Sequence, residues 1–539
     1  MADQPVSRRF WAVAVFFGLL LVAAAFWGAE RHAFGLFHDD GIYAVIAKSL
    51  AQGDGYRIIS LPGAPAETKY PPLYSFLLSW LWRAAPDFPG NIGALKVLNI
   101  AVLLGIFLVA TAFYRRYFPQ SSLGALIFAL LVAGNPILFT FTDFVLSDLL
   151  FVFFALAALT LCADQSASSA SFARIAVLGA VVGLACLTRL AAVPLVLAGA
   201  LHASLRRGWR GSLGFLLIVA LLLAPWFLWV GHSPLPANDS LYAYYAFYTL
   251  GKTGLNDFSA WLGMHTTIAL ANMRYLTDAF QLLYLTPLMP GLGPVLIVLT
   301  AVGMLVSVRR SELANWSFFL SSIALLLFWP FHPARYAAPL VPLLILFVFR
   351  GMQALEQWID AKAGEYALAA LAGKLVWIPA LLIFILNGVW LSGYLLIRDE
   401  QTTRSVFGRR LPFAWSGFEE TFAWVRQHAP AGALLATAYD PMYYLYTGRR
   451  TIRPALHRPD TYFYPYGAAQ PDVGSVEEIQ PQLEKLRINF LIIDPMEGYA
   501  EGKATLRLFD ALVAAYGERA KEVFTSADGK HKIYALAEQ

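Results

Sequence analysis

The sequence contains HDDGIY at residues 38–43 and KYPPLY at residues 69–74, both between its first two long apolar runs. Asp39 and Asp40 directly follow the first of these runs, and residues 42–50 carry apolar side chains at helical spacing. Paired carboxylates at a membrane boundary are costly unless they face water or a polar cavity, so they are candidates for a functional site. We therefore interpret the rest of the chain as the scaffold that holds this stretch at a membrane surface.

The composition is that of a polytopic membrane protein. Of 539 residues, 58% are hydrophobic and 14% are charged, whereas soluble domains carry about 25% charged residues. Measured against the roughly 20 residues that a membrane helix needs, the apolar runs predict eleven spans, near residues 10–28, 93–114, 121–140, 144–163, 172–188, 190–205, 212–231, 291–308, 316–331, 335–351 and 374–397. The amphipathic segment 264–286 predicts an interfacial helix, with a twelfth span as the alternative.

Basic residues indicate how these spans are oriented. If the N-terminus is cytoplasmic, the Arg pairs at 8–9, 115–116, 206–207 and 309–310 all fall in inside loops, as the positive-inside rule requires. The outside then receives residues 29–92, the other unusual polar loops and everything after Arg398. Because the net charge is only +5 and the basic residues lie in these loops, they indicate topology and not a nucleic-acid partner.

The last part of the chain has the pattern of a soluble domain. Strand-like runs at 433–438, 490–493 and 532–536 alternate with helical patterns at 418–428, 476–487 and 504–516, which predicts an α/β fold. We therefore expect a transmembrane domain over 1–398, with the outer loop 29–92, and an extracytoplasmic α/β domain over 399–539.

Several familiar motifs are absent from the sequence. It has no phosphate-binding loop of the P-loop or dinucleotide type and no HExxH. Cys162 and Cys186 both lie in apolar runs, so we predict neither a metal site nor a disulfide from them. Chemistry outside the cell without a nucleotide motif implies an activated donor that is already in the membrane.

The acidic residues each have a structural and a functional interpretation. Asp39 and Asp40 either cap a helix or act as a general base that takes a proton from an acceptor hydroxyl. Asp143 and Asp148 lie near the outer end of the fourth predicted span, with Asp148 one turn inside it. They either cap that helix or form a second carboxylate site that orients the acceptor, stabilises positive charge or binds a divalent cation.

Basic and aromatic residues on the same predicted face also have two interpretations. Lys69, Arg189 and Arg335 either extend to lipid headgroups or together bind a phosphate. His332, in a rigid corner between two prolines, is more typical of a structural residue than of a ligand or an acid. The outer-loop tyrosines at 242, 244, 245 and 248 form either an interfacial belt, which we favour, or a sugar-stacking surface.

These motifs resemble those of the GT-C superfamily of polytopic glycosyltransferases, most of all the bacterial relatives of protein O-mannosyltransferases and of the lipid A aminoarabinose transferase. The segments that carry the resemblance are DDGIY at 39–43, AKSLAQG at 47–53, KYPPL at 69–73, SD at 147–148, LTR at 187–189, RYAAPLVP at 335–342 and YYLYTGR at 443–449. The chain departs from the family in having Asp40 where Glu is commoner, and in having fewer predicted spans than some relatives.

The resemblance implies inverting transfer of a hexosyl or pentosyl unit from a polyprenyl-phosphate donor to a lipid, glycan or protein at the periplasmic face of a bacterial inner membrane. It implies Asp39 as the general base, oriented by Asp40, with Asp148 near the acceptor. Lys69, Arg335 and Arg189 would bind the donor phosphate. The remaining candidate substrate contacts are Tyr43, Tyr70, Asp143, His332 and Tyr336. It implies no cofactor, and dependence on a divalent metal stays open.

Two other functions are compatible with the sequence. A transporter or flippase of lipid-linked sugars would also span the membrane many times, but such proteins often show paired repeats, which this sequence lacks. A non-catalytic membrane subunit that recruits partners through its tail is the second alternative. Activity of the purified chain alone would separate that subunit from an enzyme.

Overall fold

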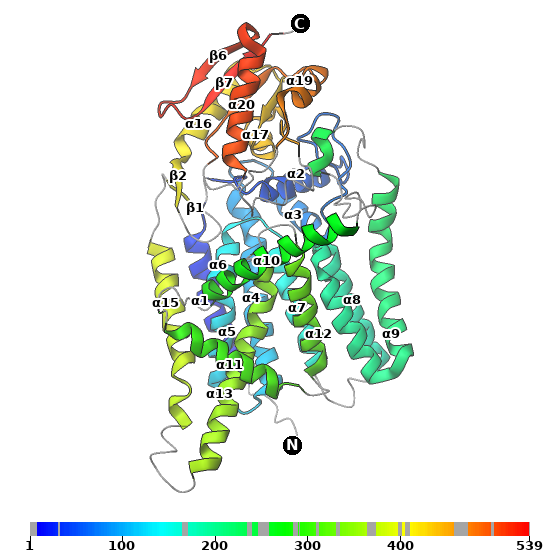
Figure 1. Ribbon diagram of the computed structural model, residues 1–539, viewed down its shortest axis with the longest axis vertical. Helices are drawn as coiled ribbons and strands as arrows, with labels where there is room; N and C mark the ends of the chain where they lie inside the picture. The colour runs from blue at the N-terminus through cyan, green and yellow to red at the C-terminus, as the bar shows by residue number, and fades with distance from the viewer. Residues whose placement is uncertain are drawn as a thin grey trace.

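The structure is a computed structural model that describes residues 8–30, 33–163, 171–233, 240–245, 258–283, 289, 291–308, 312–329, 335–363, 373–396, 402–404, 410–456, 473–496 and 501–537. A helical bundle makes up the lower part of the molecule and a small sheet with its helices lies above it (Figure 1). One continuous cluster of buried apolar side chains extends through both parts.

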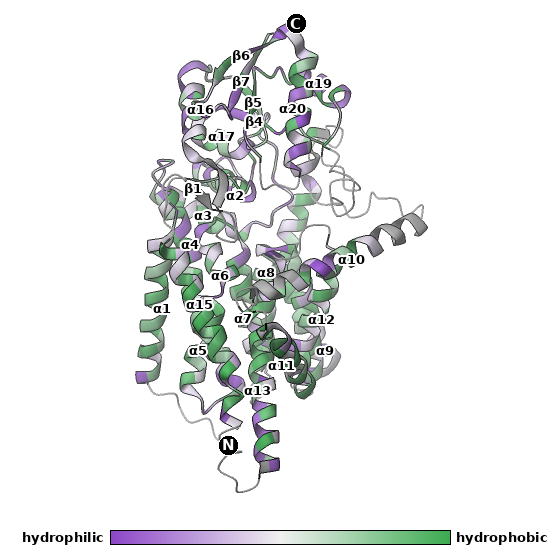
Figure 2. Cartoon of the chain, turned by 60° about the vertical axis from the view of Figure 1, so that its left-hand side comes forward, coloured by the Kyte–Doolittle hydropathy of each residue, from purple (hydrophilic) through white to green (hydrophobic). Residues whose placement is uncertain are grey.

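Apolar helices form the bundle. The longest are α1 (Arg8–Gly28), α4 (Ile92–Tyr117), α9 (Val193–His232), α13 (Val341–Ala363) and α15 (Ile378–Leu396), and the shorter ones are α5 (Ser122–Ala133), α6 (Pro136–Thr140), α7 (Asp148–Ala163), α8 (Phe172–Thr188), α11 (Leu292–Val306) and α12 (Leu313–Leu327). Hydrophobic residues dominate most of these helices, whereas the lower end of α13 carries hydrophilic residues as well (Figure 2). Such helices suit a bilayer, where every backbone polar group must be satisfied within the segment.

The predicted number of spans is not confirmed. Each of the eleven predicted runs coincides wholly or largely with a helix. Among the described residues, however, five helices are long and apolar enough to cross a membrane, or six if the bent pair formed by α5 and residues 136–143 is one span. A break at Arg207 and Gly208 inside α9 divides it where two runs were predicted, and Gly208 supplies the positive φ of 64°.

Helix α10 (Phe258–Leu283) corresponds to the amphipathic segment. It runs across the bundle and not along it, in both views (Figures 1 and 2). This orientation fits the predicted interfacial helix better than a twelfth span. Cys162 and Cys186 are buried and form no disulfide bond with each other.

The part after residue 410 contains a five-stranded sheet in the order β4-β3-β5-β7-β6. Its strands are β3 (Leu434–Thr437), β4 (Arg450–Ile452), β5 (Phe490–Ile493), β6 (Ala520–Thr525) and β7 (Lys532–Leu536). Strand β3 pairs in parallel with β4 and β5, whereas β7 pairs antiparallel with β5 and β6. A separate antiparallel pair joins β1 (Thr402–Arg404) to β2 (Arg410–Ala414).

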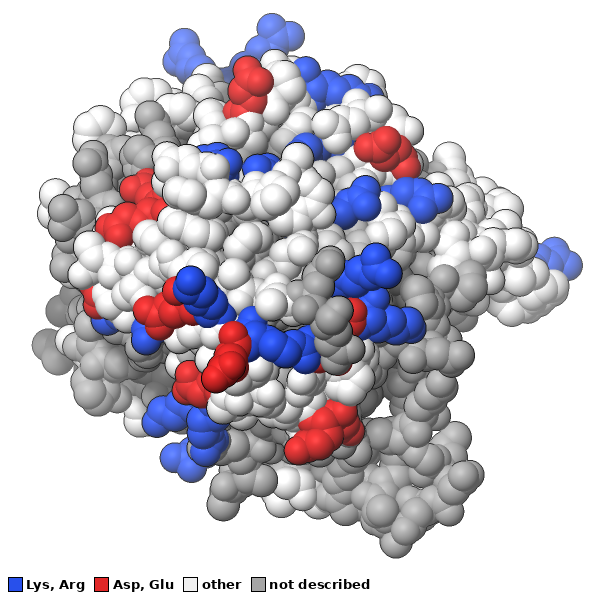
Figure 3. All heavy atoms as spheres, turned by 90° about the horizontal axis from the view of Figure 1, so that it is seen from above, with Lys and Arg blue, Asp and Glu red and all other residues white. Residues whose placement is uncertain are grey.

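Among the described residues of this part, the helices are α16 (Trp415–His428), α17 (Asp440–Thr447), α19 (Val476–Lys485) and α20 (Gly502–Tyr516), with the short turn η8 (Gly517–Arg519). The three predicted strands and three predicted helices are confirmed, whereas β4, β6 and α17 were not predicted. Seen from above, basic and acidic side chains are interspersed over this end of the molecule (Figure 3), as on an ordinary solvated surface.

Between bundle and sheet lie the short elements that carry the candidate site. They are α2 (Asp39–Gln52), α3 (Leu73–Ala84), η1 (Phe141–Asp143), η3 (Leu190–Ala192), η4 (Ser240–Tyr245) and η7 (Arg335–Leu340). Helix α2 is buried along most of its length and ends at Gly53, whose φ of 88° closes it with a left-handed residue. Its first turn packs on α17: a methyl group at Gly41 would come within 2.9 Å of the Pro441 ring.

We predict that Gly41→Ala weakens the contact between α2 and α17. The added methyl group must displace Pro441, and overpacking of this kind costs about 1–3 kcal/mol. The melting temperature of the purified protein in detergent should therefore fall. The control is Gly93→Ala, at a helical glycine with open space around it. Equal melting temperatures for the two variants would show that this contact does not hold α2.

Candidate active site

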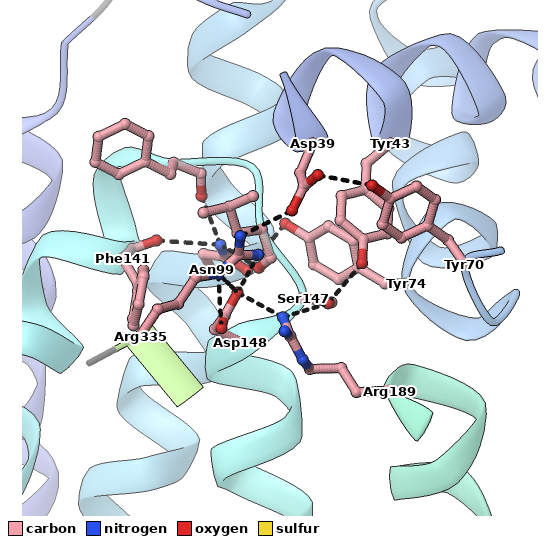
Figure 4. Close-up of polar contacts among 12 residues, drawn as sticks. Asp39, Tyr43, Tyr70, Tyr74, Asn99, Phe141, Ser147, Asp148, Arg189 and Arg335 are labelled. Atoms are coloured by element: carbon pink, nitrogen blue, oxygen red, sulfur yellow. Dashed lines mark hydrogen bonds and ion pairs between the residues drawn. The ribbon is translucent and has the colours of Figure 1, made fainter. Parts of the chain in front are cut away.

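Four charged side chains meet where the bundle faces α2. Arg335 donates from Nη1 to Asp39 Oδ2 at 2.8 Å and from Nη2 to Asp148 Oδ2 at 2.8 Å. Arg335 Nε lies 3.1 Å from both oxygens of Asp148. Arg189 Nη1 forms a further ion pair with Asp148 Oδ2 at 2.8 Å. Figure 4 shows Arg335 between the two carboxylates, so one guanidinium joins acids that are remote in the sequence.

Helix ends position these four residues. Asp39 and Asp148 are the first residues of α2 and α7, Arg189 caps the end of α8, and Arg335 begins η7. Carboxylates are favoured in the first turn of a helix because the unpaired N–H groups there carry partial positive charge. Four helix ends at one level of the bundle therefore bring two aspartates and two arginines together.

The start of α7 corrects the prediction that Asp148 lies one turn inside a helix. Phe144 is extended, and α7 begins only at Asp148. The buried side chain of Asn99 donates to the carbonyl groups of residues 141, 144 and 146, and Tyr74 donates to the Asn99 oxygen at 3.1 Å. These bonds satisfy the loop backbone inside the protein, which delays the helix until Asp148. Asn99 was not predicted, although an Asn within an apolar run was a usable signal.

Burial and charge act against each other at Asp39. Its side chain is 19% exposed, against 4% for Asp148. Burial on its own would raise the pKa of Asp39, but Arg335, Lys69 and the Tyr70 hydroxyl outweigh it and lower this pKa to about 2. Tyr70 donates to Asp39 Oδ1 at 2.6 Å. Asp39 is therefore ionised at neutral pH and has one oxygen directed to Tyr70 and the other to Arg335.

Asp40 faces away from this cluster. Its carboxylate accepts the backbone N–H groups of Gly41 at 2.8 Å and Gly35 at 3.1 Å. Burial raises the pKa of Asp40 to about 6. The structure thus supports the capping interpretation for Asp40: it fixes the turn before α2, and it affects Asp39 through the backbone.

Lys69 lies near enough to Asp39 to act on its charge. Its ammonium donates to the carbonyl oxygen of Tyr244 at 2.9 Å and lies 3.8 Å from the centre of the Tyr244 ring. Burial lowers the pKa of Lys69, and the neighbouring Asp39 opposes that shift. The buried carboxylate of Glu67 accepts the backbone N–H groups of Lys69 and Tyr70, and so turns both residues into place. Glu67 was not predicted, and no local pattern marks it.

The other predicted contacts are divided between this cluster and its surroundings. Tyr43 bonds to Ser147 at 2.8 Å, and the Tyr336 ring lies 5.1 Å from the Arg189 guanidinium. Asp143 instead pairs with Lys96 at 2.9 Å and accepts the Glu30 N–H at 2.7 Å, an arrangement typical of a structural ion pair. His332 lies outside the described residues.

Two of the outer-loop tyrosines are inside the protein. Tyr242 and Tyr245 are 6% and 1% exposed, and Tyr242 donates to the carbonyl oxygen of Pro62. The favoured interpretation of these residues as a lipid-facing belt is therefore wrong. Tyr248, the last of the four tyrosines considered for the belt, lies outside the described residues.

A small cavity of about 20 Å³ adjoins the ion-pair cluster. Asp148, Arg189 and Arg335 line it together with mostly apolar residues, among them Phe151, Phe318, Leu326, Trp329 and Leu340. A cavity of this size has room for about one water molecule, so it places charged and apolar side chains next to each other without forming an open lipid site. Among the described residues, no three acidic, histidine or cysteine side chains are grouped as a metal site would require.

Comparison with solved structures of known proteins identifies the fold of the chain. No family model matches the chain, and no curated protein matches its sequence. Solved structures do match. The structure of ArnT from Cupriavidus metallidurans bound to undecaprenyl phosphate has a TM-score of 0.57 at 14% identity, covering 99% of this chain and all of that one. The chain has the fold of the GT-C glycosyltransferases.

A second match supports the same GT-C fold. The Archaeoglobus fulgidus oligosaccharyltransferase tethered to an acceptor peptide has a TM-score of 0.58 at 12% identity, over 98% of this chain and 74% of that one. At such identities the likeness concerns the fold. The GT-C-like fold inferred from the sequence motifs is confirmed, whereas the predicted number of spans is not. The roles of individual site residues rest on the geometry above.

We predict that Asp40 makes stability depend on pH. Its folded-state pKa of about 6 exceeds the ordinary value near 3.9, so its contribution is fully present below pH 4 and is lost as the pH rises through 6. The wild-type melting temperature should fall between pH 5 and pH 7. In Asp40→Asn this fall should be smaller, but not absent, because burial also raises the pKa of Glu67.

The control for this experiment is Asp87→Asn, at an exposed aspartate of the same outer segment. It should keep the wild-type pH dependence. If Asp40→Asn also keeps it, the titrating group is not Asp40.

Proposed function

We propose that this protein is an inverting glycosyltransferase that moves a sugar from a polyprenyl-phosphate donor to an acceptor hydroxyl. The observation that carries the proposal is the ion-pair cluster of Asp39, Arg335, Asp148 and Arg189 at one end of a bundle with the GT-C fold. Solved structures of this fold include ArnT with undecaprenyl phosphate and the archaeal oligosaccharyltransferase AglB with a dolichol-phosphate and an inhibitory peptide.

Donor binding follows from the basic residues beside the small cavity. Arg189 and Arg335 are among its lining residues, and guanidinium groups bind phosphate oxygens through paired N–H donors. The apolar residues beside them would contact the first part of the hydrocarbon chain once the cavity, which has room for about one water molecule, opens to admit it. Lys69, whose charge acts on Asp39, would add a point charge to the phosphate.

The reaction needs one base and one stabilised leaving group. Asp39 takes the proton from the acceptor hydroxyl while that oxygen forms a bond to the anomeric carbon of the sugar. The bond from this carbon to the phosphate oxygen breaks, and the phosphate leaves with the electron pair. Arg189, Arg335 and Lys69 neutralise its charge. A single displacement of this kind inverts the configuration at the anomeric carbon.

Donor binding would also activate the base. A carboxylate with a pKa of about 2 is a weak proton acceptor near neutral pH. A phosphate that shares the Arg335 guanidinium would weaken its hold on Asp39 and raise the Asp39 pKa. Asp39 would thereby become an effective base only when the donor is bound, and it would not take up a proton in the absence of the donor.

The arrangement of the chain supports a location at the outer face of a bacterial inner membrane. The first turn of α1, with Arg8 and Arg9, lies at the end of the bundle away from α2 and the sheet (Figure 2). Basic residues favour the cytoplasmic side. The site and the part after residue 410 would then be periplasmic.

We predict that Asp39→Asn abolishes sugar transfer while the protein still folds and binds the donor. The amide keeps the shape of the carboxylate but cannot take a proton, and loss of a positioned base costs about 10²–10⁴-fold in rate. Donor turnover by the purified protein should be followed by mass spectrometry over a panel of polyprenyl-phosphate sugars. The matched control, Asp87→Asn on the exposed part of the same outer segment, should turn over at the wild-type rate.

Two results would contradict the proposal. Full activity of Asp39→Asn would exclude Asp39 as the base. Failure of the wild-type protein to bind any of the donors would exclude the phosphate site.

We predict that donor affinity falls at alkaline pH because of Lys69. Burial lowers the pKa of this lysine, so it loses its charge at a lower pH than an ordinary lysine. The phosphodiester of the donor does not titrate in this range. The dissociation constant should rise with pH in the wild type and change less in Lys69→Arg, which stays charged. The same pH dependence in both proteins would exclude Lys69 from the phosphate site.

A further inference from the structure

Asp440, the first residue of α17, is a buried carboxylate that contacts two separate parts of the outer region. Its Oδ1 lies 2.8 Å from His38 Nε2, and its Oδ2 accepts the Tyr245 hydroxyl at 2.7 Å. Its side chain is completely buried. Because a buried carboxylate needs such partners, these two bonds tie α17 firmly to the segments that carry His38 and Tyr245.

The first of these segments determines the direction of Asp39. His38 immediately precedes Asp39 and has φ 62° and ψ −56°, a conformation that residues other than glycine rarely adopt. Its carbonyl group accepts the Ile42 N–H at 3.0 Å, the first bond of α2. Asp440 holds the side chain of this strained residue, and therefore holds the backbone from which Asp39 projects toward Arg335.

The second segment determines the place of Lys69. Tyr245 follows Tyr244, whose carbonyl oxygen and ring both contact the Lys69 ammonium. The Tyr244 hydroxyl also lies 3.3 Å from His38 Nδ1. A second bond to the part after residue 410 comes from Gln482 of α19, which accepts the Leu241 N–H at 3.3 Å. Asp440 thus fixes η4 as well as the start of α2.

We propose that Asp440 is a positioning residue of the transfer site, through which the part of the chain after residue 410 sets the geometry of both Asp39 and Lys69. This inference rests on the proposed function, because it assigns the base to Asp39 and a donor contact to Lys69. The sheet-containing part would then contribute to catalysis. Without the Asp440 carboxylate, the segments that carry Asp39 and hold Lys69 lose the residue that fixes both of them.

The chain contains a matched control for this idea. Asp494 is also completely buried, lies 2.8 Å from His531 Nδ1 and accepts the Tyr443 hydroxyl at 2.8 Å. Tyr443 belongs to α17, so this second Asp–His–Tyr group anchors the same helix, but to the sheet and not to α2. Loss of either carboxylate should destabilise the fold to a similar extent. Only the loss of Asp440, and not that of Asp494, should affect the transfer site.

The experiment compares Asp440→Asn with Asp494→Asn in the purified full-length protein. With a donor that the wild type turns over, Asp440→Asn should lower kcat at least tenfold, through Asp39, and raise the donor KM several-fold, through Lys69. Asp494→Asn should keep both constants within about twofold of the wild type, even if its melting temperature falls as much. Equal kinetics of the two variants would overturn the proposal.

A measurement without substrate separates this proposal from the proposed function. Hydrogen exchange followed by mass spectrometry should rise in peptides covering 33–43 and 67–70 in Asp440→Asn, and only in sheet peptides in Asp494→Asn. This result is expected even if no donor is turned over. Unchanged exchange over 33–43 and 67–70 would contradict the positioning role whatever the activity.

A milder variant covers the case in which Asp440→Asn does not fold. Tyr245→Phe removes one hydroxyl from Asp440 and keeps the bond to His38. It should raise the donor KM more than it lowers kcat, because η4 holds Lys69 and not Asp39. A fall in kcat with an unchanged KM would contradict this division of roles.

Discussion

The site depends on the bridge that Arg335 makes between Asp39 and Asp148. These carboxylates begin two different helices, and Arg335 lies 296 residues from Asp39 and 187 from Asp148. Two buried acids would repel each other without a shared cation, and removing that cation would leave buried negative charge uncompensated, which is strongly destabilising. Arg189 supplies the second positive charge. Two aspartates and two arginines bring the net charge of the cluster to zero, which is the condition for keeping it at a membrane boundary.

The same bridge links assembly to chemistry. In the free protein it orders three helix ends and keeps Asp39 ionised, and in the proposed reaction an incoming phosphate would draw on the same guanidinium. The surrounding residues fit this arrangement. Tyr70 directs one oxygen of Asp39, Glu67 turns the chain at Lys69, and Asn99 holds the loop before Asp148. Most of these contacts come from irregular segments supported by rigid helices, as in many functional sites.

The sequence was informative where charge and hydropathy decide the outcome. Asp39, Asp148, Arg189 and Arg335 are charged residues at the ends of apolar runs, and alternating spans bring such ends to one face whatever the packing details. It was uninformative where distant segments meet. Asp440 contacts His38 across 402 residues, and no local pattern announces that α17 packs on α2. The late start of α7 likewise depends on Asn99, whose bonds are tertiary, and helix lengths left the number of spans unconfirmed.

The most direct test of the central claim is to locate the bond that breaks in the donor. A single turnover of the polyprenyl-phosphate sugar, run in ¹⁸O-water without acceptor, can be analysed by mass spectrometry of both products. If water bound at the site attacks the anomeric carbon, the label appears in the released sugar and the lipid phosphate keeps only its own oxygens. Label in the phosphate would show attack at phosphorus, and would contradict a glycosyl-transfer site built on Asp39 and Arg335.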